Sequence, residues 1–248
     1  ETYLQCKETL SLYNYYESAK ERYYLKVIDN KSSEIGGNLK IMSSIYTYLA
    51  KEYNAKCYDC MSWYAMNETY KTDESLPLEY KNEYATPYVI VNKNYLKDYV
   101  PIYDENGQKI NINTLVDGVL LVPKAHKESK SLDVYKKRFS CKKVVYIENQ
   151  QDKYDELYFA KEKYNEYCIN PIIYVSDESN LLSVDYMNTN LYVDTDNIAK
   201  INNEIVDMGY GDNVIFEWLY PATTKEFNKQ FIVLVPGLLF FVMYFSFT

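Results

Sequence analysis

The sequence predicts an α+β fold in which two strand–helix–strand units share one sheet. The units occupy residues 22–64 and 189–219, and each places an apolar pattern at spacings of three and four between two β-branched or aromatic runs. Further short strands lie between the units. This arrangement is typical of a split ferredoxin-like layer, β-α-β … β-α-β, with helices on one face of the sheet and a β-rich insertion. An uncharged apolar run at the C-terminal end predicts that a transmembrane helix follows.

The first unit belongs to the first predicted part of the domain, residues 1–70. Its first strand is predicted at 23–30 and its second at 55–64, because both runs are rich in aromatic and β-branched residues. Two adjacent glycines at 36–37 predict a break, and Asn38 is placed to cap a helix. The predicted apolar face of that helix comprises Leu39, Met42, Ile45, Tyr46 and Leu49.

The predicted inserted subdomain, residues 85–185, follows a polar, proline-containing boundary. Asn106 and Gly107 give its strongest turn signal, because an Asn-Gly pair favours the tight turns that join paired strands. A short basic helix is predicted at 131–139. Strands are predicted at 88–92, 109–113, 119–123, 144–148 and 172–176.

The second unit belongs to residues 186–228. Its strands are predicted at 190–194 and 214–219. Asp196 or Asn197 is placed to cap the helix between them, since short polar side chains accept hydrogen bonds from the first-turn amides. The apolar face of this helix comprises Ile198, Ile201, Ile205 and Met208, and Gly209 and Gly211 end it.

The last part, residues 229–248, predicts the start of a transmembrane helix. Its apolar stretch, 231–247, has no charged residue and is just short of the ~20 residues that cross a bilayer core. A buried helix of a soluble core would normally carry a polar face, which this stretch lacks. Trp218 and Tyr220 precede it, where interfacial aromatic residues are typical. The lipid bilayer is therefore the expected partner of 231–247.

A set of short motifs in the middle of the chain resembles a known family. The motifs are an Asn-x-Asn-Tyr-Leu step, a glycine-centred hairpin and a Leu-Val-Pro-Lys strand end, and the match runs over about residues 85–180. In this sequence they comprise Asn92, Asn94, Tyr95, Leu96, Gly107, Leu121, Val122, Pro123 and Lys124. They resemble the bacteriocin-associated integral membrane proteins, to which immunity functions are assigned. The motif residues are structural in character.

The resemblance implies a permease of the ABC transporter type, related to the FtsX-like and MacB-like proteins. Such proteins sit in the cell membrane and place an extracytoplasmic domain between their first membrane helix and the rest. The resemblance therefore implies that residues 1–228 are extracytoplasmic. It also implies a separate cytoplasmic ATP-binding subunit, and a peptide as a ligand.

Charge and motif content favour a protein without catalytic chemistry. The net charge is −8, which disfavours nucleic acid because phosphate binding needs a basic face. The single histidine, His126, has no partner nearby in sequence for acid–base or zinc chemistry and is expected in an exposed turn. Neither a phosphate-binding loop nor a nucleophile elbow is present. No catalytic, cofactor-binding or metal-binding residue is therefore predicted, and no cofactor.

The spacing of Cys57 and Cys60 matches a redox or half-zinc motif, but the second pair that zinc requires is missing. On a strand the two side chains would face opposite sides, too far apart to form a disulfide. Binding and mechanical coupling in a permease are thus the expected functions. A membrane-anchored sensor or adhesion domain with no transport role is the alternative.

Overall fold

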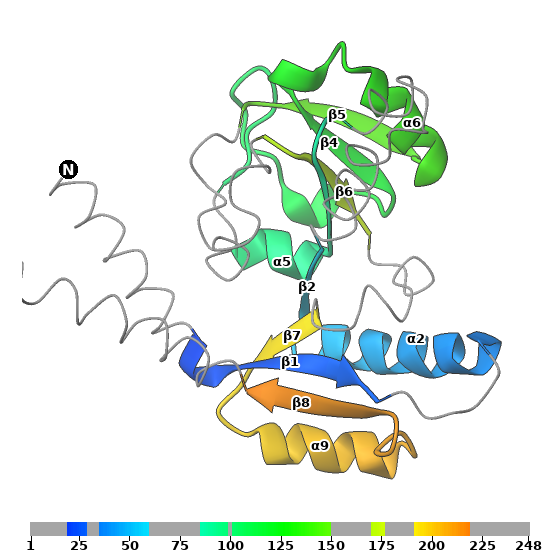
Figure 1. The fold of residues 1–248 in the computed structure, drawn as a ribbon. Helices are drawn as coiled ribbons and strands as arrows, with labels where there is room; N and C mark the ends of the chain where they lie inside the picture. The colour runs from blue at the N-terminus through cyan, green and yellow to red at the C-terminus, as the bar shows by residue number, and fades with distance from the viewer. Residues whose placement is uncertain are drawn as a thin grey trace, which may run out of the picture.

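The computed structural model describes residues 19–28, 35–59, 85–98, 101–149, 170–176 and 191–218. Within these ranges the chain is a mixed α+β protein with one eight-stranded sheet (Figure 1). The strands are β1 (Arg22–Val27), β2 (Lys56–Asp59), β3 (Tyr88–Val91), β4 (Val119–Pro123), β5 (Lys143–Ile147), β6 (Ile172–Val175), β7 (Leu191–Asp194) and β8 (Val214–Trp218). The α-helices are α2 (Ile35–Glu52), α5 (Lys93–Asp98), α6 (Lys130–Arg138) and α9 (Ile198–Asp207).

The two strand–helix–strand units share one sheet, so this prediction is confirmed. The strand order is β5-β4-β6-β3-β2-β7-β1-β8, which places the four strands of the two units next to one another. Within this group β1 pairs antiparallel with both β7 and β8, and β2 pairs antiparallel with β7. The first strand of one unit therefore lies between the two strands of the other, and neither unit forms a sheet alone.

Helices α2 and α9 pack on the same face of these four strands and enclose one apolar core. The core joins Leu25 of β1 with Met42 and Ile45 of α2 and with Ile201 and Ile205 of α9, all of them buried. The hydroxyl of Tyr48 on α2 also donates to Glu204 Oε2 on α9 at 2.6 Å. Most of the predicted apolar positions are buried against the sheet, which confirms the helical spacing of both units. Met208 is the exception, since it follows the last residue of α9 and is exposed, and the side chain of Leu39 lies outside the described residues.

The start of the first helix differs from the prediction. Helix α2 begins at Ile35, so residues 36–37 lie inside its first turn and mark no break, and Asn38 is not its N-cap. Glycine is tolerated there because first-turn amides lack helical partners in any case. The second helix follows the prediction more closely. Asn197 caps α9 by accepting from the Lys200 amide at 3.1 Å, and Gly209 ends it with φ +83°.

The inserted region continues the sheet beyond β2. Lys56 and Cys57 pair β2 with β7, whereas Tyr58 and Asp59 pair it with β3. Strand β2 is therefore the joint between the two halves of the sheet, as Figure 1 shows. Pairs β3–β6 and β4–β5 are parallel, and β4–β6 is antiparallel. The insertion is thus a mixed unit rather than a set of simple hairpins.

Two helices cover opposite faces of this second half of the sheet. Tyr95 and Leu96 of α5 pack in one apolar cluster, and Leu132 and Tyr135 of α6 pack in the other. Helix α6 confirms the basic helix predicted at 131–139. Helix α5 has no counterpart among the predicted elements.

One predicted strand is wrong and one predicted turn is confirmed. Residues 109–113 form no strand; a 3₁₀-helix occupies Ile112–Thr114, and Lys109 makes only an isolated bridge. The cause is Asn111, whose side chain accepts from the Asn113 amide at 3.1 Å and stabilises the turn instead. Gly107 stands in the hairpin turn with φ +79°, where its amide donates to the Asp104 carbonyl at 3.0 Å.

The C-terminal apolar segment, 231–247, lies outside the described residues, as do Tyr220, Cys6, Cys60 and Cys168. Among the residues that are described, no helix combines the length and the hydropathy of a membrane span.

Candidate functional site

The family-motif asparagines form a joint between the first unit and the insertion. Asn92 is buried, and its Oδ1 accepts from the amides of Cys57 at 3.1 Å and Tyr95 at 2.9 Å. Its Nδ2 donates to the Ala55 carbonyl at 2.9 Å. Asn92 thus caps α5 and at the same time fixes the turn that leads into β2.

The rest of the Asn-x-Asn-Tyr-Leu step supports the same joint. Asn94 Nδ2 donates to the Ala50 carbonyl at 2.8 Å, near the end of α2, and to the Ala55 carbonyl at 3.2 Å. Tyr95 and Leu96 are buried, and the Tyr95 ring lies 5.0 Å from the ring of Tyr58 on β2. These residues hold elements together, and no ligand is needed to explain them.

The other motif residues lie in separate places. Leu121 and Val122 are buried on opposite faces of β4, and Pro123 ends that strand. Lys124 begins a 3₁₀-helix, Lys124–His126, and its Nζ lies 2.6 Å from Glu148 Oε1. The structure therefore brings together the asparagine step, but it does not gather the motif residues into one site.

The residues considered for chemistry are also dispersed. His126 ends the 3₁₀-helix after β4, so it lies in a turn as expected, but its side chain is partly buried rather than exposed. Within the described ranges no three His, Cys, Asp or Glu side chains are grouped so as to hold a metal ion. Cys57 and Cys141 are free thiols, the first buried and the second half-buried. Burial raises the pKa of Cys57, and the nearby Asp59 carboxylate raises this pKa further.

Cys57 should therefore resist alkylation in the folded chain. The thiolate is the reactive species, and a raised pKa combined with burial removes both thiolate and access. We expect iodoacetamide at pH 8 to modify Cys141 at least tenfold faster than Cys57, measured by peptide mass spectrometry. In the unfolded chain both should react at similar rates. Equal rates in the folded chain would show that Cys57 is accessible.

The chain enters β1 and leaves β8 at one place. Tyr23 at the start of β1 pairs with Trp218 at the end of β8, and their rings stack with centroids 6.3 Å apart. The Trp218 indole also donates to the Lys20 carbonyl at 3.0 Å. The segments that precede residue 19 and follow residue 218 therefore both join the domain at this end of the β1–β8 pair.

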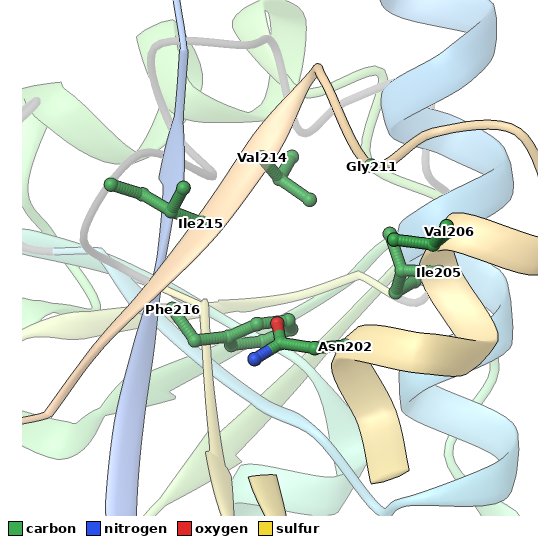
Figure 2. A pocket seen from close by; sticks show the side chains of 7 residues that line it. All are labelled: Asn202, Ile205, Val206, Gly211, Val214, Ile215 and Phe216. Atoms are coloured by element: carbon green, nitrogen blue, oxygen red, sulfur yellow. The ribbon is translucent and has the colours of Figure 1, made fainter. Parts of the chain in front are cut away.

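The edge of the sheet carries a mostly apolar hollow toward the other end of β8, near its first residues. Strand β8 is the last strand in the order, and α9 lies alongside it (Figure 1). A hollow of about 360 Å³ opens between them. Figure 2 shows Val214 and Phe216 of β8 directed toward α9, with Ile215 on the other side of the strand. The hollow is lined by Asn202, Ile205, Val206, Gly211, Val214, Ile215 and Phe216.

Exposed apolar side chains are concentrated around this edge. Of the seven exposed large hydrophobic residues in the described ranges, five lie on α9, on β8 or directly beside them. They are Ile28, Val206, Met208, Ile215 and Trp218. The other two, Tyr103 and Val116, belong to the insertion. Exposed apolar side chains near the open edge of a sheet are typical of a place where another chain binds.

The opposite face of the four strands carries a network of charges. Arg22 Nε lies 2.8 Å from Asp194 Oδ1, and Lys56 Nζ lies 2.7 Å from Asp194 Oδ2. The Arg22 guanidinium also lies 4.5 Å from the centre of the Tyr192 ring. Burial opposes ionisation of Asp194, but the hydrogen bonds and charges of Arg22 and Lys56 outweigh it and lower its pKa. The network ties β1, β2 and β7 together.

Asp194→Asn should destabilise the domain in a pH-dependent way. The lowered pKa of Asp194 means that its charge stabilises the fold above its unfolded pKa of about 4, and that this contribution is lost as pH falls through the folded value. At pH 7 we expect a loss of about 1–2 kcal/mol in the free energy of unfolding. The difference in free energy of unfolding between the variant and the parent chain should disappear at low pH. Glu217→Gln, in the exposed Lys26 pair, should cost under about 0.5 kcal/mol at any pH.

Sequence reasoning finds the strand and helix that border the hollow but misses the hollow itself. The apolar residues of 214–219 read as ordinary strand residues, and only the strand order shows that they stand at an edge. The exposed Val206, off the predicted apolar face of its helix, is the one local signal. The chain matches no family model, no curated protein and no solved structure.

Proposed function

We propose that this chain is the extracytoplasmic domain of an ABC-type permease of the bacteriocin-associated kind, built on a split ferredoxin-like layer. It acts without catalysis, by binding at its surface and by mechanical coupling to membrane helices. The order β8-β1-β7-β2 with antiparallel pairing supports the fold assignment. The motifs of residues 92–124 support the family, and the uncharged segment 231–247 supports the membrane link.

One observation carries the proposal: the chain enters β1 and leaves β8 at the same end of this strand pair. A domain placed between two membrane helices must receive both of them on the same side. The Tyr23–Trp218 stack and the Trp218–Lys20 hydrogen bond provide such an arrangement. Displacement of either helix would act directly on β1 or on the edge strand β8.

The coupling has a direct route into the domain. Five residue pairs join β1 to β8, and β1 lies on the core that α2 and α9 share. A change in the relative position of the two membrane helices would therefore move β1 and β8, and with them the helices α2 and α9 that pack on the same core. The exposed edge and the hollow both belong to β8. Binding of a ligand there and movement of the membrane helices would therefore shift the same equilibrium between conformations of the domain.

A membrane-anchored sensor or adhesion domain remains the second candidate, and the β8 edge is the observation that favours it. Such an edge can bind another chain without any transporter. The two candidates differ in the remainder of the full reading frame. Three or more further apolar spans, with an ATP-binding subunit encoded next to it, support the permease; a single span supports the sensor.

Placement outside the cytoplasm is tested by labelling intact cells. Asn106 stands exposed in the hairpin turn, so Asn106→Cys in a chain lacking its native cysteines presents one accessible thiol. A membrane-impermeant maleimide should label it in intact cells as fully as in lysed cells. Labelling only after lysis would place the domain in the cytoplasm and refute the proposal. The same chain without a cysteine gives the background.

A further inference from the structure

We infer that the outer edge of β8 binds an extended, positively charged peptide segment, which pairs with the strand and places an apolar side chain in the hollow beside α9. The inference rests on the proposed function, in that it names the ligand of the same binding surface. Three independent features of this edge carry it: the direction of the backbone groups, the shape of the hollow, and the charge around it.

The backbone of β8 is oriented for a further strand. The Ile28 amide donates to the Asn213 carbonyl at 2.8 Å, which sets the phase of the β1–β8 ladder. In antiparallel pairing alternate residues bond to one neighbour, so Ile215 and Glu217 direct their backbone groups toward β1. Val214 and Phe216 direct theirs to the other side, where none of the described strands lies. An extended peptide can form hydrogen bonds there.

The hollow selects the side chain that a paired peptide presents. Val214 and Phe216 form one wall and Ile205 and Val206 of α9 form the other, so an aliphatic side chain would be enclosed on both sides. At Gly211 an added Cβ would lie 2.7 Å from Val206 Cγ2, so the opening depends on a glycine at this position. The space of about 360 Å³ admits one or two side chains of a strand but not a helix.

The charges around the hollow favour a positively charged partner. Val206 and Gly211, which line it, are followed in the chain by the exposed carboxylates Asp207 and Asp212. The last turn of α9 contains no basic residue, so the negative end of its dipole adds to these charges. A lysine or arginine beside the apolar residue of a peptide would be attracted here. A second copy of this chain, itself with a net charge of −8, would be repelled.

The test measures binding of defined peptides to the 248-residue chain in neutral detergent micelles. The probe is a fluorescein-labelled peptide, KVTVTVK, followed by anisotropy against empty micelles. Its acidic counterpart, EVTVTVE, and a form methylated on alternate backbone nitrogens are the comparisons. We expect the cationic peptide to bind at least tenfold more tightly than the acidic one at low salt, with a smaller difference at high salt. Methylation should abolish binding, because it removes the donors that pair with β8.

Two matched variants locate the site. Val206→Lys adds a positive charge between the two carboxylates of the rim and a longer side chain beside the hollow, and it should lower the affinity for KVTVTVK at least tenfold. Val116→Lys alters an equally exposed valine in the insertion and should leave the affinity unchanged. Both valines are exposed, so both variants should keep the unfolding midpoint of the parent chain.

Three results would overturn the inference: equal affinity for the cationic and acidic peptides, binding unaffected by methylation, or full binding by Val206→Lys. Concentration-dependent dimers in sedimentation that Val206→Lys abolishes would assign the edge to self-association, which also overturns it. Labelling at position 106 does not depend on the edge. The placement of the domain and the chemistry of its ligand can therefore fail separately.

Discussion

Asn92→Ala should lose about 3–4 kcal/mol of folding free energy, more than we expect from Asp194→Asn or Asn94→Ala. Its side chain accepts hydrogen bonds from the amides of Cys57 and Tyr95 and donates one to the carbonyl of Ala55. All three hydrogen bonds lie in a buried region. Alanine leaves these groups without that partner and removes the cap of α5. Urea unfolding of the chain in detergent micelles, followed by circular dichroism, measures the loss.

Asn94→Ala is the matched control, because this asparagine stands two residues away and also donates to the Ala50 and Ala55 carbonyls. It is half-exposed, so water can replace its hydrogen bonds, and we expect a loss of only about 1 kcal/mol. If the two variants were equally stable, the joint between β2 and α5 would depend on apolar packing rather than on the buried amide.

A flexible insertion of four to six glycine and serine residues between Thr224 and Lys225 should abolish function in the full-length protein. The proposed coupling runs from β8 into the membrane segment, and a flexible linker decouples the ends that it joins. The domain should stay folded, because the insertion lies beyond the last residue of its sheet. The measurement is survival of cells that express the full-length protein in a peptide-resistance assay.

The control insertion has the same length and lies between Glu105 and Asn106, in the hairpin turn of the inserted region. It adds equal flexibility away from the proposed route, so protection should be kept. Unchanged protection with both insertions would contradict mechanical transmission and would leave binding alone as the role of the domain. Loss of protection on replacing Cys57 or His126 alone would instead indicate a chemical role.

The sequence predicts both strand–helix–strand units because their information is local. Residues such as Met42, Ile45, Ile201 and Ile205 recur at helical spacing, and the sheet buries them. Helix α5 escapes prediction because its six residues are too few to show a period, and because Asn92 caps it while also bonding to residues 35 or more positions earlier. The false strand at 109–113 has a similar cause, since the Asn111 side chain redirects the backbone.

The candidate site was beyond local prediction for a different reason. A hollow at a sheet edge depends on which strand is last in the order, and this order arises from pairings between residues nearly 200 positions apart, such as Tyr23 and Trp218. Composition can disfavour a nucleic-acid partner because net charge is a property of the whole chain. It cannot place an apolar surface, because residues such as Ile215 read alike in a central strand and in an edge strand.

The shared exit of the chain beside Tyr23 and Trp218 also sets how the domain responds to force. Tension that separates residues 19 and 218 acts perpendicular to the strands and loads the β1–β8 hydrogen bonds one after another. Because the bonds do not share the load, a low force separates the two strands. The described strands β3, β4, β5 and β6 lie outside this load path, so they keep their pairing while the edge opens. A joint tilt of both ends leaves every ladder bond in place. The domain is therefore compliant to stretching and stiff to rotation, and β8 with its hollow is the first element that stretching would release.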